Sequence, residues 1–229
     1  MLIFLQYIVK NDNKGELEML KKILIAAALI GTLGLPLHAQ GTQADAEKYA
    51  TQATQYYQRG NYAKALEYHN KALVILLKVK GENHPDTARS YNNIGEVYRQ
   101  QGNYAQALEF YNKALAIELK VKGENHPDTA ASHYNIGVVY GMQGNYAKAL
   151  EFFNKALAIR LKVLGENHPD TVASHCGIAG TLYRSGKKTE ARDHLRKAAA
   201  IALKTLGPDH PTTKQISAVL QFVENELSK

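Results

Sequence analysis

The sequence predicts an all-α protein in which four antiparallel helix pairs stack in a row and one further helix caps the C-terminal end. Two short motifs carry this prediction, because both recur with a period of 42 residues. The first, Gly-Glu-Asn-His-Pro-Asp-Thr, occupies 81–87, 123–129 and 165–171. The second, Gly-Asn-Tyr-Ala, begins at positions 60, 102 and 144. A constant period of this length is typical of repeated helical units, each of which buries an apolar face on its neighbour.

The segment at 19–39 has the layout of a secretory signal peptide. Lys21 and Lys22 precede an uncharged apolar run of 13 residues at 23–35, and the small residue Ala39 offers a cleavage point. A membrane-spanning helix needs about 20 apolar residues, so this run is short for an anchor. We therefore expect a periplasmic or secreted protein with no stable membrane anchor after cleavage. The alternative is an uncleaved, cytoplasmic chain in which this segment is a buried first helix.

Residues 1–18 do not belong to that layout, because Asp12, Glu16 and Glu18 place acidic groups ahead of the apolar run. A signal peptide begins instead with a positively charged region. We therefore expect translation to start at Met19, which would make 1–18 an extension that comes from a wrongly assigned start codon.

The second repeat shows the helical pattern most clearly, with one helix expected at about 86–100 and another at about 104–122. Apolar and small residues recur there at the i, i+3, i+4, i+7 spacing of a helix. On the first helix they are Tyr91, Ile94, Gly95 and Tyr98. On the second helix, the expected buried face consists of Ala107, Leu108, Tyr111, Ala114, Leu115, Ile117 and Leu119. Gly102 and Gly123 are expected to end the two helices in the left-handed backbone conformation.

The same pattern, extended by the period, predicts four helix pairs within 40–210. The pairs are expected at 43–80, 86–122, 128–164 and 170–206. A capping helix is expected within 211–229, and its apolar stripe consists of Ile216, Val219, Leu220, Val223 and Leu227. An open stack of repeats needs such a cap, because its last face would otherwise stay uncovered.

The second repeat also resembles the tetratricopeptide repeat. The residues at the motif's W, L, G, Y, A, F and A positions are Tyr91, Ile94, Gly95, Tyr98, Ala107, Tyr111 and Ala114. The period is longer than the usual ~34 residues, and the Gly-Glu-Asn-His-Pro-Asp-Thr link looks like the long repeats of kinesin light chains and their bacterial relatives. The resemblance covers 43–213. It implies a right-handed superhelical solenoid that serves as a protein-binding scaffold and not as an enzyme.

The composition argues against several other classes of protein. Hydrophobic residues make up 45% and charged residues 21% of the 229 residues, which indicates a globular chain. The net charge is +7, but no run of five basic residues occurs, so we expect no nucleic-acid partner. The single cysteine, Cys176, can form neither an internal disulfide nor a CxxC zinc site. No phosphate-binding loop, GxSxG or HExxH motif is present, so we expect no cofactor, no metal and no catalytic residues.

The resemblance implies that the first helix of each repeat lines a concave groove, where a protein or peptide ligand would bind. The groove residues that it implies are Tyr57, Arg89, Asn92, Asn93, Glu96, Arg99, Tyr134, Asn135, Val138, Met142 and Tyr183. Asn93 and Asn135 match asparagines that hold a peptide backbone in kinesin light chain repeats, and an amide both donates and accepts hydrogen bonds. The implied groove is polar near the second repeat and apolar near the third and fourth, which favours a peptide with an acidic end and an apolar end.

Other interpretations stay open at this stage. Ala131 and Ala173 stand at the later positions that correspond to Arg89, so a basic clamp for a terminal carboxylate is not expected. Asn93 and Asn135 could bridge neighbouring helices instead of binding a ligand. The whole chain could also be a self-associating scaffold that docks through its convex face or its ends. The identity of the partner and the oligomeric state are left open.

Four histidines recur with the same period, at His84, His126, His168 and His210. A row of metal ligands is one interpretation of this pattern. Neighbouring helices lie about 10 Å apart, however, whereas the ligands of one ion lie about 2 Å from it. We therefore expect each histidine to belong to a hydrogen-bonded turn that precedes a helix.

Overall fold

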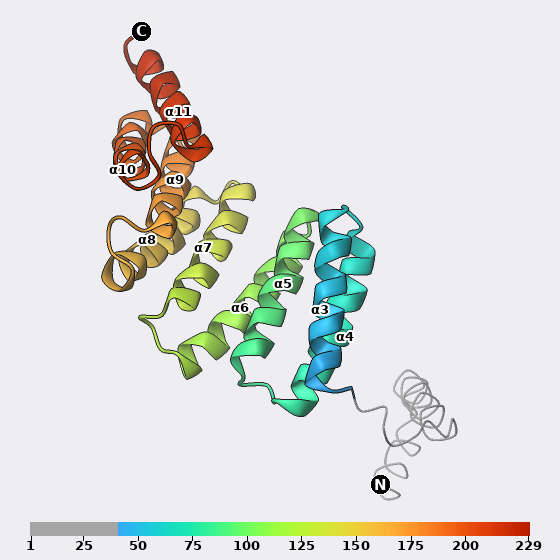
Figure 1. Cartoon of the computed structure of the whole chain (residues 1–229). Helices are drawn as coiled ribbons and strands as arrows, with labels where there is room; N and C mark the ends of the chain where they lie inside the picture. The colour runs from blue at the N-terminus through green and yellow to red at the C-terminus, as the bar shows by residue number, and fades with distance from the viewer. Residues whose placement is uncertain (1–40) are drawn as a thin grey trace, which may run out of the picture. The chain divides into compact units, whose positions relative to one another are not determined.

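The computed structural model describes residues 41–229, of which 42–229 form one compact unit of helices and short connections (Figure 1). The helices are α3 (Gln43–Gln58), α4 (Tyr62–Val79), α5 (Pro85–Gln100), α6 (Tyr104–Val121), α7 (Pro127–Met142), α8 (Tyr146–Val163), α9 (Pro169–Arg184), α10 (Lys188–Leu206) and α11 (Pro211–Leu227). Helices pack in consecutive pairs, each pair packs on the next, and α11 packs on α10. Four helix pairs with a C-terminal capping helix are therefore confirmed, and no strand occurs within 41–229.

The expected extension at 1–18 and the expected signal peptide at 19–39 fall outside the described residues. Start site, cleavage and export therefore stay predictions. Between residues 41 and 229, no helix combines the length and the apolar character that crossing a lipid bilayer requires.

The loop histidine of each repeat caps the helix that follows it. The Nδ1 atom of His84 accepts a hydrogen bond from the backbone N–H of Asp86 at 3.1 Å. His126, His168 and His210 make the equivalent bond in the next three loops. A proline follows each of these histidines at the start of the helix, where its missing N–H leaves no helical hydrogen bond unmade. The expected hydrogen-bonded turn is confirmed.

The Gly-Asn motif turns the chain between the two helices of a pair. Gly102 of this motif follows α5 with a φ of 76°. Gly123, the first residue of the link to the next repeat, follows α6 with a φ of 83°. This left-handed backbone is strained for residues that carry a Cβ, so the predicted role of both glycines is confirmed. Directly after Gly102, the side chain of Asn103 accepts a hydrogen bond from the backbone N–H of Gln106 at 3.3 Å and so caps α6.

The core of each pair depends on a close approach of its two helices. In the second repeat, Ile94 of α5 and Tyr111 of α6 are fully buried. A Cβ placed on Gly95 would lie 2.9 Å from Cδ1 of Tyr111, which is closer than packed atoms tolerate. The third repeat has the same arrangement, with 3.0 Å between a Cβ on Gly137 and Cδ1 of Phe153. In these two repeats glycine is therefore required by the aromatic ring that faces it, whereas the first and fourth repeats carry Ala53 and Ala179 at this position.

One predicted buried position is wrong by a single residue. Leu119 was expected inside but is 38% exposed, whereas Glu118 is only 3% exposed. Position 118 faces the contact between α6 and α7, where Asn92 donates a hydrogen bond from Nδ2 to Oε1 of Glu118 at 3.0 Å. The apolar spacing misses this position because a buried, hydrogen-bonded carboxylate breaks the pattern of apolar residues.

The apolar stripe of α11 is less buried than predicted. Ile216 and Val223 are buried and Leu220 is half-buried, but Val219 and Leu227 are exposed. The reason is topological, because α11 packs on α10 without a following helix to cover its other side.

Candidate functional site

A polar cluster joins the first and second repeats, with Glu96 at its centre. The Glu96 carboxylate accepts hydrogen bonds from the hydroxyls of Tyr57 at 2.7 Å and Tyr111 at 2.9 Å. The guanidinium of Arg99 donates from Nε at 2.8 Å and also from Nη2, and Gln100 donates from Nε2 at 3.0 Å. Three of the predicted groove residues, Tyr57, Glu96 and Arg99, therefore bind one another.

This cluster has electrostatic consequences. Burial opposes ionisation of Glu96, but the hydrogen bonds from Arg99, Tyr57, Gln100 and Tyr111 outweigh it and lower the pKa of Glu96 to about 2. The hydrogen bond to Glu96 in turn raises the pKa of Arg99. A carboxylate of a ligand would have to displace Glu96 from Arg99, so this arginine is a poor carboxylate clamp.

The remaining polar groove residues, three on α5 and Asn135 on α7, have different surroundings. Arg89 is exposed and pairs with Asp86 at 2.5 Å. Asn92 is turned towards the next repeat, where its amide exchanges hydrogen bonds of 3.2 Å with the hydroxyl of Ser132 on α7. Asn93 is half-buried, and within residues 41–229 no hydrogen bond to its side chain is found, which leaves its amide available. Asn135 on α7 is likewise half-buried with no side-chain bond in the described part of the chain.

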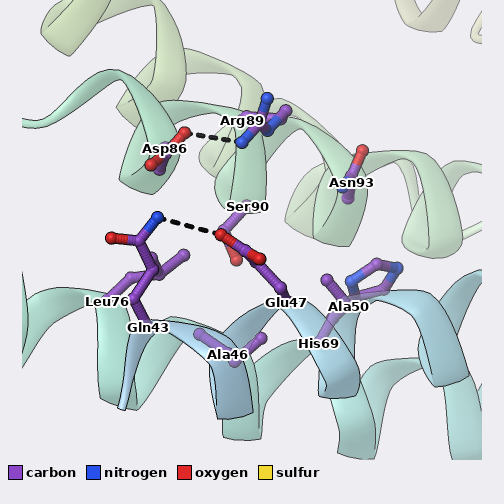
Figure 2. Close-up of a pocket in the computed structure, with 11 residues that line it drawn as sticks. Gln43, Ala46, Glu47, Ala50, His69, Leu76, Asp86, Arg89, Ser90 and Asn93 are labelled. Atoms are coloured by element: carbon purple, nitrogen blue, oxygen red, sulfur yellow. Dashed lines mark hydrogen bonds and ion pairs between the residues drawn. The ribbon is translucent and has the colours of Figure 1, made fainter.

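The available amide of Asn93 lies at a cleft between α3 and α4 on one side and α5 on the other (Figure 2). The cleft encloses about 50 Å³ and is lined by Gln43, Ala46, Glu47, Ala50, His69, Ala72, Leu76, Asp86, Arg89, Ser90 and Asn93. A second hollow of about 170 Å³ adjoins it, lined by Thr54, Tyr57, His69, Asn93, Glu96 and Val97. Both hollows share His69 and Asn93, so together they form one continuous surface of mixed polar and apolar lining.

Sequence reasoning missed His69 and Ser90 at this surface. His69 belongs to the second helix of its repeat, α4, whereas the implied groove drew only on first helices. A signal is nevertheless present, because His69 stands 42 residues before Tyr111 and 84 before Phe153, where the second and third repeats carry an aromatic core residue. A polar residue at a core position is the informative departure from a repeat pattern.

The predicted residues of the third and fourth repeats differ in their surroundings, and Tyr134 and Val138 pack in an apolar cluster. Tyr134 packs against Phe153, with 5.1 Å between ring centroids, and the guanidinium of Arg160 lies 4.8 Å from the centre of its ring. Val138 packs at the edge of the same apolar cluster, and Met142 is exposed. The hydroxyl of Tyr183 donates to Oε2 of Glu226 at 2.7 Å and so ties α9 to the capping helix.

A wider, largely apolar hollow lies between α9, α10 and α11. It encloses about 260 Å³ and is lined by Cys176, Ala179, Gly180, Leu195, Gln215, Ile216 and Val219. Burial raises the pKa of Cys176, so its thiol stays protonated at neutral pH and is a poor nucleophile. The described residues contain no cluster of three or more histidine, cysteine or acidic side chains that could hold a metal ion.

Comparisons with known proteins agree with this architecture. The tetratricopeptide repeat profile matches residues 46–120, 93–162 and 128–204. The crystal structure of a putative kinesin light chain from Podospora anserina with nearly identical TPR-like repeats is similar at 25% identity and a TM-score of 0.66, over 81% of this chain and 92% of that one. No match was found among functionally curated proteins.

More distant structures share the fold. BtubC (BKLC) from P. vanneervenii is similar at 17% identity with a TM-score of 0.64, over 81% of this chain and 82% of that one. A Rap protein complexed with competence and sporulation factor is similar at 17% identity with a TM-score of 0.66, over 80% of this chain and 49% of that one. The chain belongs to the tetratricopeptide repeat family, in its kinesin light chain-like form, and has the fold of a protein–protein interaction scaffold.

Proposed function

We propose that this protein binds an extended segment of a partner protein along the side formed by the first helices of the repeats. The observation that carries the proposal is the pair of adjoining hollows between α3 and α5, which share His69 and Asn93. The Asn93 amide has no hydrogen bond within the described residues, and an amide can pair with both the N–H and the C=O of an extended backbone. A site with unused hydrogen-bonding groups at its wall is suited to a ligand that supplies their partners.

The charge distribution refines the kind of segment that would fit. Arg89 already pairs with Asp86, and Arg99 already pairs with Glu96. The N-terminal half therefore offers hydrogen bonds more readily than free positive charge, while the hollow at Cys176 and Val219 offers apolar contact. We infer a partner segment that is polar at one end and apolar at the other.

The test is a display library of unstructured peptides selected on the full chain, followed by affinity measurements on the selected peptides. Asn93→Ala and Asn135→Ala should weaken binding by about three- to tenfold each, as expected for the loss of one hydrogen bond. Lys155→Ala is the matched control, because Lys155 is exposed on α8 and its ammonium contacts Glu151 and the Phe152 ring. Unchanged affinity in both asparagine variants would remove the groove from the proposal.

A second candidate function is self-association through the convex face. The observation that favours it is a row of exposed leucines, Leu119, Leu161 and Leu203, which recur with the repeat period on α6, α8 and α10. Sedimentation velocity over a hundredfold range of protein concentration tests it. A larger species that disappears in a Leu161→Lys variant would support self-association, and a monomer throughout would contradict it.

We further propose that the protein acts outside the cytoplasm, on the basis of the signal-peptide layout of 19–39. Cell fractionation combined with the intact mass of the native protein tests this. A mass that begins at Gln40 in an extracytoplasmic fraction would support export, whereas an uncut chain in the cytoplasm would contradict it.

A further inference from the structure

Three serines occupy the same position of successive repeats, at Ser90, Ser132 and Ser174, and all three are buried. Each lies where a first helix packs on the preceding repeat. The hydroxyl of Ser132 exchanges hydrogen bonds with the amide of Asn92, and Oγ of Ser174 accepts a hydrogen bond from Nη1 of Arg160 at 2.8 Å. Ser90 is only 5% exposed, yet its Oγ has no hydrogen-bond partner among residues 41–229.

The missing partner has a structural reason. Glu118 and Arg160 reach towards Ser132 and Ser174, and the residue at the corresponding position of the first repeat is Leu76. At the register of Asn92, it carries Ala50. Both residues line the cleft, and neither has a polar side-chain atom to offer. The first repeat thus lacks the polar bridge that its successors have, and the cleft stands in its place. A buried hydroxyl without a partner is costly, so an external group that bonds to it would bind favourably.

The groups that face this cleft are matched to an uncharged ligand. His69 is only 4% exposed, and burial lowers its pKa to about 4, so its ring is neutral at pH 7 and has one donor and one acceptor nitrogen. Ser90 and Asn93 also both donate and accept. Figure 2 shows Ser90 on the side of α5 that faces α3, with His69 contributed from the opposite side of the cleft.

The charged groups at the rim offset one another. Asp86 pairs with Arg89 at 2.5 Å and with Lys80 at 2.6 Å. The remaining carboxylate, Glu47, accepts a hydrogen bond from Gln43 at 2.9 Å. Two acidic and two basic side chains thus balance around the cleft, which gives neither an anion nor a cation a clear advantage.

The size of the cleft limits what can enter. A single water molecule needs roughly 10–15 Å³ of such space, and an engineered cavity of about 150 Å³ holds benzene. The cleft, with about 50 Å³, is larger than the first and much smaller than the second. It therefore accommodates a group of a few heavy atoms.

We propose that the cleft between α3, α4 and α5 is a binding subsite for an uncharged hydroxyl or carboxamide group, with Ser90 and His69 as its hydrogen-bond partners. In the context of the proposed function, on which this assignment of the ligand rests, the group belongs to a serine, threonine, asparagine or glutamine of the partner segment. The ligand completes at the first repeat the polar bridge that Asn92 and Arg160 supply at the later ones.

The direct test uses acetamide as the probe and the ¹⁵N-labelled full chain, with the imidazole signals of His69 followed by NMR. Saturable shifts of the His69 ring are expected with acetamide but not with acetate or methylammonium. Ser90→Ala should weaken acetamide binding by about three- to tenfold, because one hydrogen bond is lost. His69→Leu assigns the signals by their loss, and it is compatible with the fold because Leu195 occupies the same register in the fourth repeat.

Ser132→Ala is the matched control, because it removes the equivalent hydroxyl at a position where the bridge is internal. It should leave acetamide binding unchanged. No saturable shift at His69, equal affinity in wild type and Ser90→Ala, or tighter binding of a charged probe would each overturn the proposal. Peptide selection on the same chain separates the two claims. Acetamide binding without any selected peptide would refute the peptide function alone, and selected peptides without acetamide binding would refute this subsite alone.

Discussion

The contact of the first repeat with the second and the contact of the second with the third share one backbone arrangement but differ in what fills them. Where α7 packs on α5 and α6, Asn92, Glu118 and Ser132 form an internal polar bridge. Where α5 packs on α3 and α4, Ala50, Leu76 and Ser90 stand at the same three positions and enclose a cleft. The contact of the third repeat with the fourth is closed again, by Arg160. A repeat array can thus open a binding cleft by omitting one polar bridge, without altering its helices.

The largest effect is expected from removing the bridge between the third and fourth repeats. Arg160 is buried, donates to the backbone oxygen of Asp170 at 2.9 Å and to Ser174, and lies over the ring of Tyr134. Arg160→Ala leaves these groups unpaired and a cavity beside them, so the free energy of unfolding should fall by ~3 kcal/mol. Urea denaturation measures this. The control Arg196→Ala, which removes an exposed arginine paired with Glu224, should cost no more than ~1 kcal/mol.

The second effect is a pH dependence that belongs to the bridge at Glu118. Burial raises the pKa of Glu118 to about 7, and the negative charge of Asp128 adds to the rise. The hydrogen bonds from Ser132 and Asn92 and the charge of Lys122 lower this pKa but do not outweigh burial. A carboxyl whose pKa is raised by folding stabilises the native state fully below its unfolded pKa, near 4.5, and loses that contribution as the pH rises through 7. The free energy of unfolding should therefore decrease by ~2 kcal/mol between pH 5 and pH 8 on account of this group.

The control for this dependence is Glu118→Gln, which should abolish it. Comparison with that variant is required because His69, whose pKa is lowered to about 4 by burial, acts with the opposite sign and destabilises the fold as the pH falls below about 6.5. Denaturation of both proteins at pH 5, 6, 7 and 8 isolates Glu118. An identical pH profile for wild type and Glu118→Gln would contradict the prediction.

A smaller effect is expected from closing the cleft of the first repeat. Ala50→Asn places an amide at the register of Asn92, within the reach that Asn92 has to Ser132, so it should hydrogen-bond to Ser90. We expect a gain of ~1 kcal/mol in the free energy of unfolding, the usual net contribution of one hydrogen bond. The same variant should lose acetamide binding, as monitored at the His69 ring. A variant that is more stable and still binds acetamide would contradict the claim that the missing polar bridge creates the binding cleft.

The smallest effect is expected from Ser90, whose hydroxyl has no partner in the described part of the chain. Ser90→Ala removes a hydroxyl that has no hydrogen bond among residues 41–229 and relieves its desolvation, so the free energy of unfolding should not fall and is expected to rise by up to ~1 kcal/mol. Ser132→Ala removes a bonded hydroxyl and leaves Asn92 short of a partner, which should cost ~1 kcal/mol. Equal losses in the two variants would show that Ser90 has a partner within the folded chain.

The sequence predicted the helices well because their determinants are local. The turn at His84 and the left-handed Gly102 each depend on residues within a few positions of one another, and the 42-residue period repeats these local signals along the chain. The groove was predicted only through the resemblance, and its ligand-binding role stays a prediction. Tyr57, Glu96 and Arg99 were all expected in that groove, but the hydrogen bond between Tyr57 and Glu96 was not foreseen, since it joins residues 39 positions apart.

What the sequence determined by itself is the repeat: its period, its helix pairs, its turns and its cap, all of which follow from local backbone preferences and apolar spacing. What only the tertiary structure decided is which polar residues meet between repeats. Ser90 and Ser132 are the same residue at the same register, yet within residues 41–229 Ser132 is hydrogen-bonded and Ser90 is not. The difference arises because the partner of each serine lies about 40 residues away, and only the packing of one repeat on the next brings the two together.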